Sequence, residues 1–293
     1  MSAAGIVGII GGAGWLGSSI AMQGLTAGVL APASLIISSR SPRGTLFSAW
    51  PDVMWTSDNA DLARRADVLI LSVRPQQFPD ISLNFEGRLV ISVMAGVSMA
   101  TLQRRLQTDR IVRSMPNAGA EIGRSYTPWV AGSGVTSSDR AFVSALMSSC
   151  GEEDEVATEE QIDYLTGLSG SGPAFPALLA SAMLTHAEAR GLPPHVARKA
   201  VQGVICGASR LLDGDLFAPA ATVETFIDYE GTTAAALREM IRAGLPEAVH
   251  AGLQAAISAA AEMAAGPANL QNSPEGAGAT DASPSAQQNN DAN

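Results

Sequence analysis

Short runs of consecutive apolar residues alternate with amphipathic stretches through the first half of the chain. The first run, residues 5–10, is apolar throughout, as expected for a strand that is buried on both faces of a sheet. The same pattern predicts strands at 35–39, 53–55, 68–73, 89–93 and 111–114, and helices at 18–30, 58–65 and 99–106. Strands that alternate with helices pair in parallel. The pattern therefore predicts an α/β Rossmann fold, which is a doubly wound parallel sheet.

The pattern changes after about residue 155. Residues 161–265 are almost entirely compatible with helix, with a long helix expected over 173–190 and others beginning at Pro193-Pro194 and at Pro246. We therefore expect a second, all-α domain. Residues 267–293 contain almost nothing apolar and cannot bury enough surface to offset chain entropy, so they are expected to form a disordered tail. The expected boundaries are 1–158 for the Rossmann domain, 159–266 for the helical domain and 267–293 for the tail.

The charge balance restricts the classes of partner. The chain carries 18 basic and 28 acidic residues, a net charge of −10, which repels phosphate polymers and anionic bilayers. We therefore expect neither nucleic acid nor membrane as a partner. Residues 1–39 contain no charged side chain, but glycines interrupt this stretch repeatedly and no basic segment opens it. Neither a signal peptide nor a membrane span is predicted, and a cytoplasmic location is expected.

Few side chains suit metal binding or covalent catalysis. Cys150 and Cys206 are far apart in the sequence and show no CxxC spacing, so both are expected to be buried, reduced thiols. The three histidines lack a ligand spacing such as HExxH, and no metal site is predicted. Lys199 is the only lysine and follows Arg198, so a solvated helix face is a better interpretation than a Schiff base.

A glycine-rich turn follows the first predicted strand. Residues 12–17 have the pattern GxGxxG, which in that position, between a strand and a helix, is typical of a dinucleotide-binding turn. The first glycine permits the turn, the second lets a pyrophosphate approach the backbone, and the third allows close packing of helix on strand. Backbone N–H groups at the start of the helix would face the phosphates. A turn with a purely structural role is the alternative.

The end of the second predicted strand indicates which dinucleotide binds. Sites specific for NAD place Asp or Glu there, to bind the ribose 2′-hydroxyl. Here residues 38–41 read Ser-Ser-Arg-Ser, without a carboxylate. Arg40 among hydroxyl groups can hold a 2′-phosphate through charge-assisted hydrogen bonds, which favours NADP(H). Arg40 as an ordinary exposed residue is the alternative.

Several segments resemble one family, in one order. They are 66–76, with Val73-Arg74-Pro75-Gln76 at its end; 92–98, Ser-Val-Met-Ala-Gly-Val-Ser; 113–117, with Met115-Pro116-Asn117; 166–174, Thr-Gly-Leu-Ser-Gly-Ser-Gly-Pro-Ala; Gly191-Leu192-Pro193; and Gly231-Thr232-Thr233. Together they resemble the pyrroline-5-carboxylate reductase family, from about residue 5 to residue 264. The resemblance implies a Rossmann domain and a helical domain that interleaves with the same domain of a partner, in a homodimer or a higher homo-oligomer.

The resemblance also implies a site. The cofactor would be NADP(H), and its binding residues would be Gly12, Ala13, Gly14, Trp15, Leu16 and Gly17 at the pyrophosphate, Ser39 and Arg40 at the 2′-phosphate, Asn59 on the adenosine side, and Val73, Arg74, Pro75 and Ala95 at the nicotinamide half. The substrate, a small cyclic imine, would be bound by Gly231, Thr232 and Thr233. The Thr233 hydroxyl would lie near the ring nitrogen, as the candidate catalytic group. From the sequence alone, an N-terminal helix cap is an equally good interpretation of Thr233, and both can hold.

The sequence departs from the family pattern at four places. Gly11 adds one residue ahead of the glycine turn, which we expect the strand end to accommodate, and Arg74 stands in place of Lys. Ala118-Gly119 replace the Thr-Pro that usually follows Met-Pro-Asn. Residues 227–230 read Ile-Asp-Tyr-Glu, where the family usually has Thr-Ser-Pro-Gly. Asp228 and Glu230 would repel an anionic substrate unless they turn away or become protonated.

Three hypotheses about function follow. The first is NADPH-dependent reduction of 1-pyrroline-5-carboxylate to L-proline, by hydride transfer to a cyclic imine. The second is a related reductase that acts on another imine or keto compound, uncharged or cationic. The third is a catalytically silent NADP-binding paralogue that assembles with partners.

Overall fold

A single sheet of eight strands forms the centre of the first half of the molecule. The computed structural model describes residues 5–40, 44–213 and 218–265. The strands lie in the order β3-β2-β1-β4-β5-β6-β7-β8. Their bounds are β1 (Val7–Ile10), β2 (Leu35–Ser38), β3 (Met54–Thr56), β4 (Val68–Leu71), β5 (Leu89–Ser92), β6 (Ile111–Ser114), β7 (Ser125–Ala131) and β8 (Gly151–Glu155). The first six pair in parallel, and β7 runs antiparallel to β6 and parallel to β8. The doubly wound sheet is confirmed, with a reversed pair at one edge.

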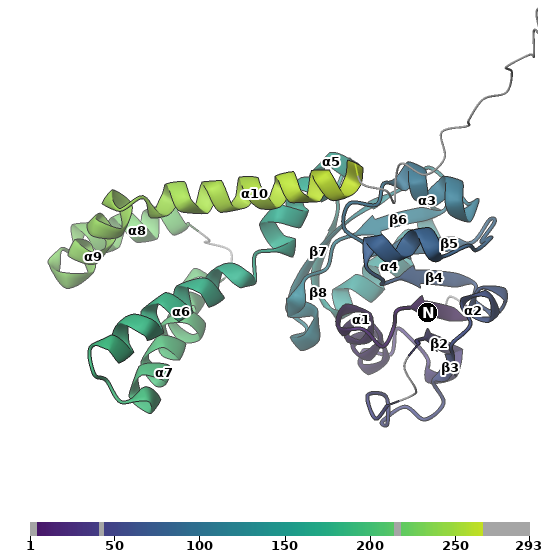
Figure 1. The fold of residues 1–293 in the computed structure, drawn as a ribbon, viewed down its shortest axis with the longest axis horizontal. Coiled ribbons are helices and arrows are strands. Elements are labelled where there is room, and N and C mark those ends of the chain that lie inside the picture. The colour runs from purple at the N-terminus through teal and green to yellow at the C-terminus, as the bar shows by residue number, and fades with distance from the viewer. Residues whose placement is uncertain (1–4, 41–43, 214–217, 266–293) are drawn as a thin grey trace, which may run out of the picture.

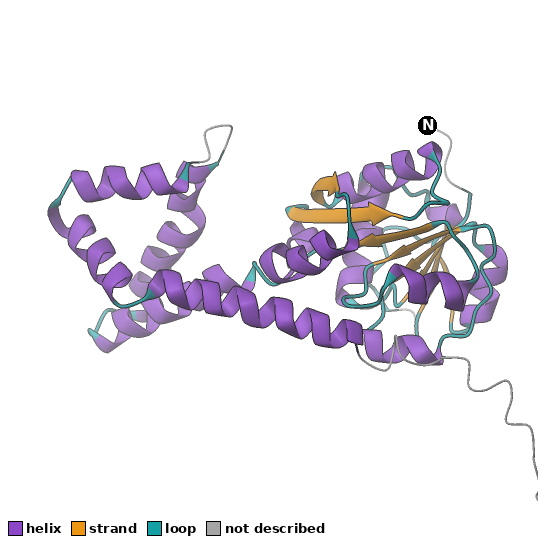
Figure 2. Ribbon diagram, turned by 90° about the horizontal axis from the view of Figure 1, so that it is seen from above, coloured by secondary structure: helices purple, strands orange, loops and turns teal. Residues whose placement is uncertain are grey.

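Helices cover both faces of this sheet (Figures 1 and 2). They are α1 (Trp15–Thr26), α2 (Asn59–Arg65), α3 (Met99–Leu106) and α4 (Ser137–Ser149). Successive strand residues point to opposite faces, so neighbours such as Ile9 and Ile10 belong to different apolar clusters. One cluster packs beneath α1 and α4 and the other beneath α2 and α3. The continuous apolar runs in the sequence are explained by this burial on two sides.

The second half of the molecule is helical and extends away from the sheet (Figure 1). Its helices are α5 (Glu159–Leu165), α6 (Ala174–Ala189), α7 (Pro194–Gln202), α8 (Pro219–Asp228), α9 (Gly231–Arg242) and α10 (Leu245–Ala265). Helix α6 packs against α7, and α8 packs against α9. The 21-residue α10 then returns alongside α5 and the turn that follows it. The predicted all-α region is confirmed, and the predicted tail over 267–293 lies outside the described residues.

Some predicted elements differ from the observed ones. Helix α1 begins at Trp15 and ends at Thr26, not at 18 and 30, because Gly14 is already its N-cap and Gly28 adopts a positive φ of 69°. The pattern did not predict β7, α4 and β8. Strand β8 reads Gly-Glu-Glu-Asp-Glu, and its polarity is acceptable because it is the outermost strand. Cys150 is buried as expected, but Cys206 is exposed on this chain, so its predicted burial is wrong for the single chain.

Candidate functional site

A cleft of about 830 Å³ lies at the carboxyl ends of β1, β2, β4 and β5. It is lined by the turn after β1 and by residues that follow the other three strands. The strand order reverses at this point, since β1 lies between β2 and β4. In open α/β sheets such a switch point, at the carboxyl ends of the strands, is where ligands bind. The volume is in the range of small-molecule and cofactor sites.

The turn between β1 and α1 supplies backbone groups to this cleft. Gly14 is the N-cap of α1, no side chain caps the helix, and its first turn contains no acidic residue. The first N–H groups of α1 have no partner within the helix, because they lie at its N-terminus. An anion in the cleft would therefore meet free N–H donors and the positive end of the helix dipole.

Gly11, the additional residue, closes this turn. It follows β1 directly, has a φ of 79°, and its carbonyl accepts a hydrogen bond of 2.9 Å from the Gly14 amide. A Cβ atom at Gly11 would lie 2.2 Å from the Ser72 carbonyl oxygen. Only glycine fits this approach of the turn to β4. The extra residue is thus accommodated where the strand ends, as expected.

Of the thirteen predicted cofactor residues, eleven line the cleft. They are Ala13, Gly14, Trp15, Leu16, Ser39, Arg40, Asn59, Val73, Arg74, Pro75 and Ala95. Gly12 and Gly17 do not line it. A Cβ atom at Gly12 would approach the Ile37 side chain to 2.8 Å, and one at Gly17 would lie 2.7 Å from the Gly11 carbonyl oxygen. These two glycines allow close packing behind the turn, and direct contact of either with a cofactor stays a prediction.

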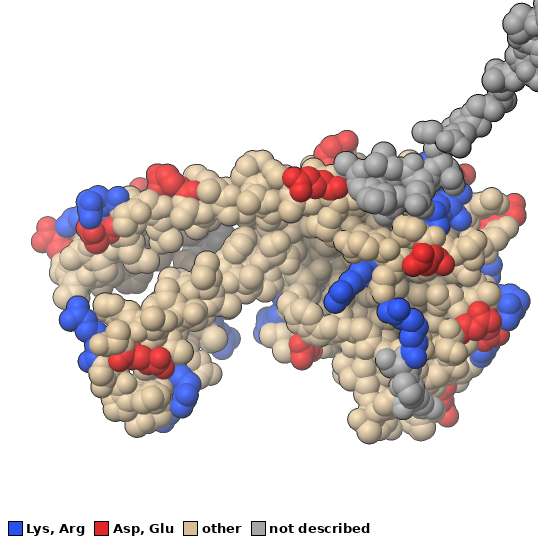
Figure 3. Space-filling view, viewed as in Figure 1, with Lys and Arg blue, Asp and Glu red and all other residues tan. Residues whose placement is uncertain are grey.

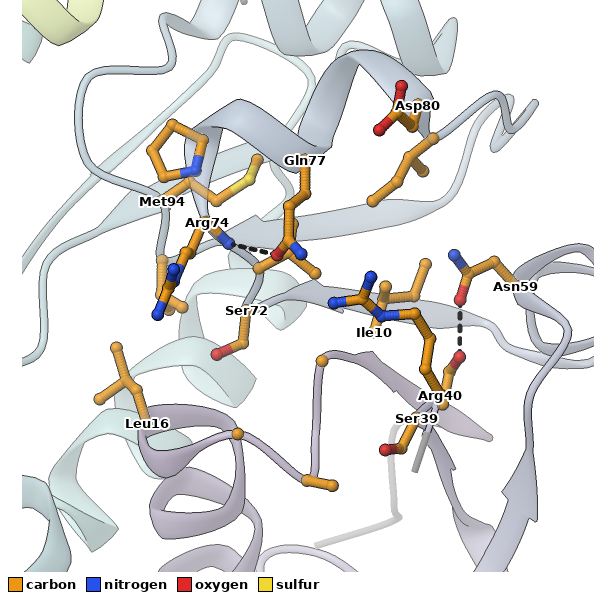
Figure 4. A pocket seen from close by; sticks show the side chains of 18 of the residues that line it. Ile10, Leu16, Ser39, Arg40, Asn59, Ser72, Arg74, Gln77, Asp80 and Met94 are labelled. Carbon is orange, nitrogen blue, oxygen red and sulfur yellow. Dashed lines mark hydrogen bonds between the residues drawn. The ribbon is translucent and has the colours of Figure 1, made fainter. Parts of the chain in front are cut away.

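One side of the cleft carries polar groups suited to a phosphorylated ribose. Figure 4 shows Ser39, Arg40 and Asn59 together on the β2 side. The buried Ser38 hydroxyl donates a hydrogen bond of 2.6 Å to the Asn59 side-chain oxygen. This bond fixes the Asn59 side chain so that its NH2 group remains available as a donor. Arg40 supplies the positive charge on this side.

The other side of the cleft is formed by the segments after β4 and β5. Figure 4 shows Arg74, Met94 and Leu16 here, on the side opposite Asn59. The Arg74 backbone amide donates to the Gln77 side-chain oxygen at 3.2 Å, which holds the first turn of the 3-10 helix η2 (Pro75–Asp80). Val73, Pro75 and Ala95 add an apolar lining. A flat ring could pack against these apolar side chains, beside the Arg74 guanidinium.

The sequence interpretation missed several lining residues. They are Ile10, Gly11, Ser38, Ser57, Ser72, Gln77, Asp80, Ile81, Val93 and Met94. Most of them end a strand or directly follow one, so their position at a strand end was the available signal. Gln77 and Asp80 reach the cleft only because Pro75 begins a short 3-10 helix. No hydrophobic periodicity in the sequence predicts this 3-10 helix.

Trp15 lies at the open rim of the cleft, and 64% of its surface is exposed. Its indole N–H donates to Glu121 Oε2 at 2.7 Å, and the Glu121 carbonyl accepts from Gln23 at 3.2 Å. Both contacts join α1 to the 3-10 helix η3 (Ala118–Ile122), which follows Met115-Pro116-Asn117. The departure from the family pattern at Ala118-Gly119 therefore lies beside the glycine turn.

The predicted substrate residues lie in the helical half, far from the cleft of the same chain. Gly231, Thr232 and Thr233 form the first turn of α9, at the end of the molecule opposite the sheet (Figure 1). Glu230 is the N-cap and makes no side-chain cap bond, so the interpretation of Thr233 as the cap is wrong. Thr233 is the third helical residue and is exposed. A single chain does not bring these residues to the cofactor cleft.

Within the described ranges, no group of three or more His, Cys, Asp and Glu side chains could hold a metal ion. None of the helices in the part of the chain that the structure describes is both long enough and apolar enough to span a bilayer.

The fold and the cleft define a class, that of two-domain proteins with a Rossmann-type dinucleotide-binding half and a helical second half. Residues 159–263 match the family described as pyrroline-5-carboxylate reductase dimerisation. Residues 6–96 match the family described as NADP oxidoreductase, coenzyme F420-dependent.

Relatives with one and the same name are similar to this protein over most of its chain. A pyrroline-5-carboxylate reductase of Glycine max is 30% identical over 241 residues, covering 80% of this chain and 87% of that protein. One of Vibrio alginolyticus is 35% identical over 190 residues, covering 62% and 70%. The solved 1-pyrroline-5-carboxylate reductase of Streptococcus pyogenes superposes with a TM-score of 0.76 at 28% identity, covering 87% of this chain and 98% of that one. The chain belongs to the pyrroline-5-carboxylate reductase family.

Proposed function

We propose that this protein reduces 1-pyrroline-5-carboxylate to L-proline with NADPH. The observation that carries the proposal is the cleft at the switch point of the sheet, which brings together the N-terminal N–H groups of α1, Arg40 and an apolar side. Curated relatives with the name pyrroline-5-carboxylate reductase, about 30% identical over most of the chain, support the substrate. The match of residues 6–96 to a family described as NADP oxidoreductase supports the cofactor.

The parts of the cleft correspond to the parts of the cofactor. The N–H groups at the start of α1 would hold the pyrophosphate, and Ser39 with Arg40 would hold the 2′-phosphate. Asn59 would bind the adenosine side through the NH2 group that Ser38 leaves free. Val73, Pro75 and Ala95 would form the wall against which the nicotinamide lies. The glycine turn fits this cofactor, because Gly11 and Gly14 line the cleft with backbone and no side chain.

Hydride transfer requires little from the side chains. NADPH supplies the hydride when it is bound, and the protein holds the donor and acceptor carbons together away from water. The C=N bond of the imine accepts the hydride at carbon and one proton at nitrogen, which gives the secondary amine of proline. The Thr233 hydroxyl would orient that nitrogen, and the N–H groups of Gly231 and Thr232 would bind the substrate carboxylate.

The separation of Thr233 from the cleft indicates that a partner completes the site. Residues 159–263 match a family described by its dimerisation, and these residues contain Thr233. We therefore propose a homodimer in which the helical half of one chain faces the cofactor cleft of the other. A cytoplasmic location, expected from the sequence, stays a prediction.

One observation favours a second candidate substrate class. Asp228, Tyr229 and Glu230 are all exposed and directly precede the first turn of α9. Carboxylates at this position would favour an uncharged or cationic cyclic imine over an anionic one. A reductase for such an imine is the alternative to the reduction of 1-pyrroline-5-carboxylate.

The experiment is a substrate panel at saturating NADPH, with product identified by mass. It compares 1-pyrroline-5-carboxylate with 1-pyrroline and with six-membered cyclic imines with and without a carboxylate. Proline as the preferred product supports the main proposal. Turnover of the uncharged imines without proline formation would establish the second candidate instead. Bound NADPH without oxidation by any imine would indicate a catalytically silent paralogue.

A further inference from the structure

A buried arginine links the sheet to the first helix of the helical half. Arg113 is on β6, and only 3% of its side chain is exposed. Its guanidinium donates to the Glu159 carboxylate and, at 2.8 Å, to Asp163 Oδ1. Glu159 and Asp163 are four residues apart on α5 and therefore lie on the same face of that helix. A buried charge requires such pairing, so α5 is held against the sheet at this point.

Glu159 has a second contact that Asp163 lacks. The same Oε1 atom that accepts from Arg113 also accepts a hydrogen bond of 2.8 Å from the backbone N–H of Met99. Met99 is the first residue of α3, where an N–H group has no partner within its own helix. Glu159 therefore provides the only hydrogen bond to that amide among the described residues.

The segment that ends at Met99 forms part of the cofactor cleft. Arg113 lies opposite Ser92, the last residue of β5, in the parallel pairing of β5 and β6. The chain after Ser92 lines the cleft with Val93, Met94 and Ala95 and then turns through Gly96, at a φ of 69°, toward α3. The segment 93–98 is therefore held at both ends, by the sheet at Ser92 and by Glu159 at Met99.

Apolar packing connects the same elements. Ile162 on α5 is fully buried against Met115 and Val130, and Ala95 and Met99 pack against this cluster. Ala95 thus lines the cleft on one side and packs on the other against the cluster that contains Ile162. A displacement of α5 relative to the sheet would move the wall against which the nicotinamide is proposed to lie.

We propose that Glu159 is a positioning residue for hydride transfer. Together with Arg113, it fixes segment 93–98 relative to α5 and so sets the position of the nicotinamide wall. The proposal rests on the proposed function of the cleft. A misplacement of about 1 Å at a reacting centre can reduce a rate by about 100-fold, so a loosened wall reduces kcat more than it reduces binding of the adenosine half.

The test compares four variants in the full-length protein. Glu159→Ala removes the acceptor, and Glu159→Gln keeps a carbonyl oxygen in the same place. Asp163→Ala removes the other partner of Arg113 without touching Met99. Glu160→Ala is the control for the favourable charge in the first turn of α5, because Glu160 contacts neither Arg113 nor Met99 in the described structure.

The first readout is amide hydrogen exchange of a peptide that covers residues 94–102, measured without NADPH or imine. We expect exchange at Met99 to be about tenfold faster in Glu159→Ala than in the wild type, and close to wild type in Asp163→Ala and Glu160→Ala. Glu159→Gln should restore most of the protection. Equal exchange rates of the Met99 amide in Glu159→Ala and Asp163→Ala would contradict the role of the hydrogen bond between Glu159 and Met99.

The second readout separates positioning from a merely structural role. Glu159→Ala should lower kcat about tenfold while KM for NADPH stays within about twofold, and Glu159→Gln should recover most of kcat. The enhanced fluorescence of saturating bound NADPH should also decrease in Glu159→Ala, and this signal requires no substrate. If kcat and this fluorescence both stay at the wild-type level, Glu159 has no positioning role. A wild type that binds NADPH but makes no proline would contradict the proposed function only, because the fluorescence comparison still decides the role of Glu159.

Discussion

The two halves of the molecule differ in how completely one chain buries its apolar residues. In the α/β half, helix α1 alone has seven buried residues, and the strands β1, β2, β4, β5 and β6 are buried along their whole length. In the helical half, α6 and α8 have no buried residue, and α9 has only Ala234. Leu178 on α6 is 73% exposed. The face in view in Figure 3 shows long uncharged stretches over the helical half.

This difference shows which part of the proposed active site a single chain completes by itself. The cofactor cleft has its walls, its helix N-terminus and its hydrogen bonds in place within one chain. The proposed substrate residues are exposed, on helices whose apolar faces are not covered by any other part of the described structure. Extended apolar surface of this kind indicates an interaction site. We therefore expect the α/β half to respond to mutation as an independent domain, and the helical half to respond through assembly.

The largest effect is expected from a charge on the exposed apolar surface of the helical half. Leu178→Asp places one charge per chain in the proposed interface, and desolvating the two charges of a dimer should cost about 4 kcal/mol, or roughly a 1000-fold weaker dimer. Activity should fall with the dimer, while NADPH still binds. Light scattering over a concentration series measures the dissociation.

Leu46→Asp is the control, because Leu46 is 44% exposed, lies in the α/β half and does not line the cleft that the partner is proposed to face. It should leave the oligomeric state unchanged. A Leu178→Asp protein that remains a fully active dimer would remove this contrast between the halves.

Within the α/β half, the glycine turn should be the most sensitive backbone position. Gly11→Ala would force a Cβ atom to 2.2 Å from a backbone oxygen at a positive φ, so we expect a loss of about 3 kcal/mol in the free energy of unfolding and weaker NADPH binding. Gly28 also has a positive φ, 69°, but nothing lies within 4 Å of its Cβ position. Gly28→Ala should cost only about 1 kcal/mol. Urea unfolding measures both variants. Equal losses of unfolding free energy would contradict the close approach of Gly11 to the Ser72 carbonyl.

The next effect concerns the choice of cofactor. Arg40→Asp replaces the proposed 2′-phosphate ligand by a carboxylate suited to a 2′-hydroxyl, so kcat/KM for NADPH should decrease about 50-fold relative to that for NADH. Arg104→Asp makes the same change of charge on α3, outside the cleft, and should leave the ratio unchanged. An unaltered ratio in Arg40→Asp would count against the role of Arg40.

The smallest effect should arise from an ion pair that belongs to the α/β half alone. Burial raises the pKa of Asp139, but hydrogen bonds from Arg110 and Thr136 more than compensate, and the net pKa lies below its usual value. A lowered folded-state pKa stabilises the fold above the unfolded-state pKa, and this contribution is lost as pH falls through the folded-state value. Asp139→Asn should therefore lower the free energy of unfolding by about 2 kcal/mol at pH 7, and this difference should shrink only as pH falls below about 4, toward the lowered folded-state pKa of Asp139. A difference between the two proteins that is independent of pH would contradict this account.

The same contrast explains how much the sequence predicted. Helix Met99–Leu106 and strand Ile111–Ser114 were predicted to the residue, because their periodicity reflects burial within one chain. Eleven cofactor residues lie in the cleft because each follows a strand in a recognisable motif. Strand β8 was missed because an edge strand can be polar, and the role of Glu159 was missed because its partners, Met99 and Arg113, are 60 and 46 residues away. In the proposed dimer, the position of Gly231–Thr233 relative to the cleft depends on the partner chain, so it has no local signal in the sequence.

The most direct test of the account is an equilibrium titration of the purified protein with NADPH and, separately, with NADH, in the absence of any imine. We predict saturable enhancement of dihydronicotinamide fluorescence with NADPH, at a dissociation constant at least about tenfold lower than that for NADH. Failure of both dinucleotides to bind would contradict the assignment of the cleft, and with it the proposed reaction.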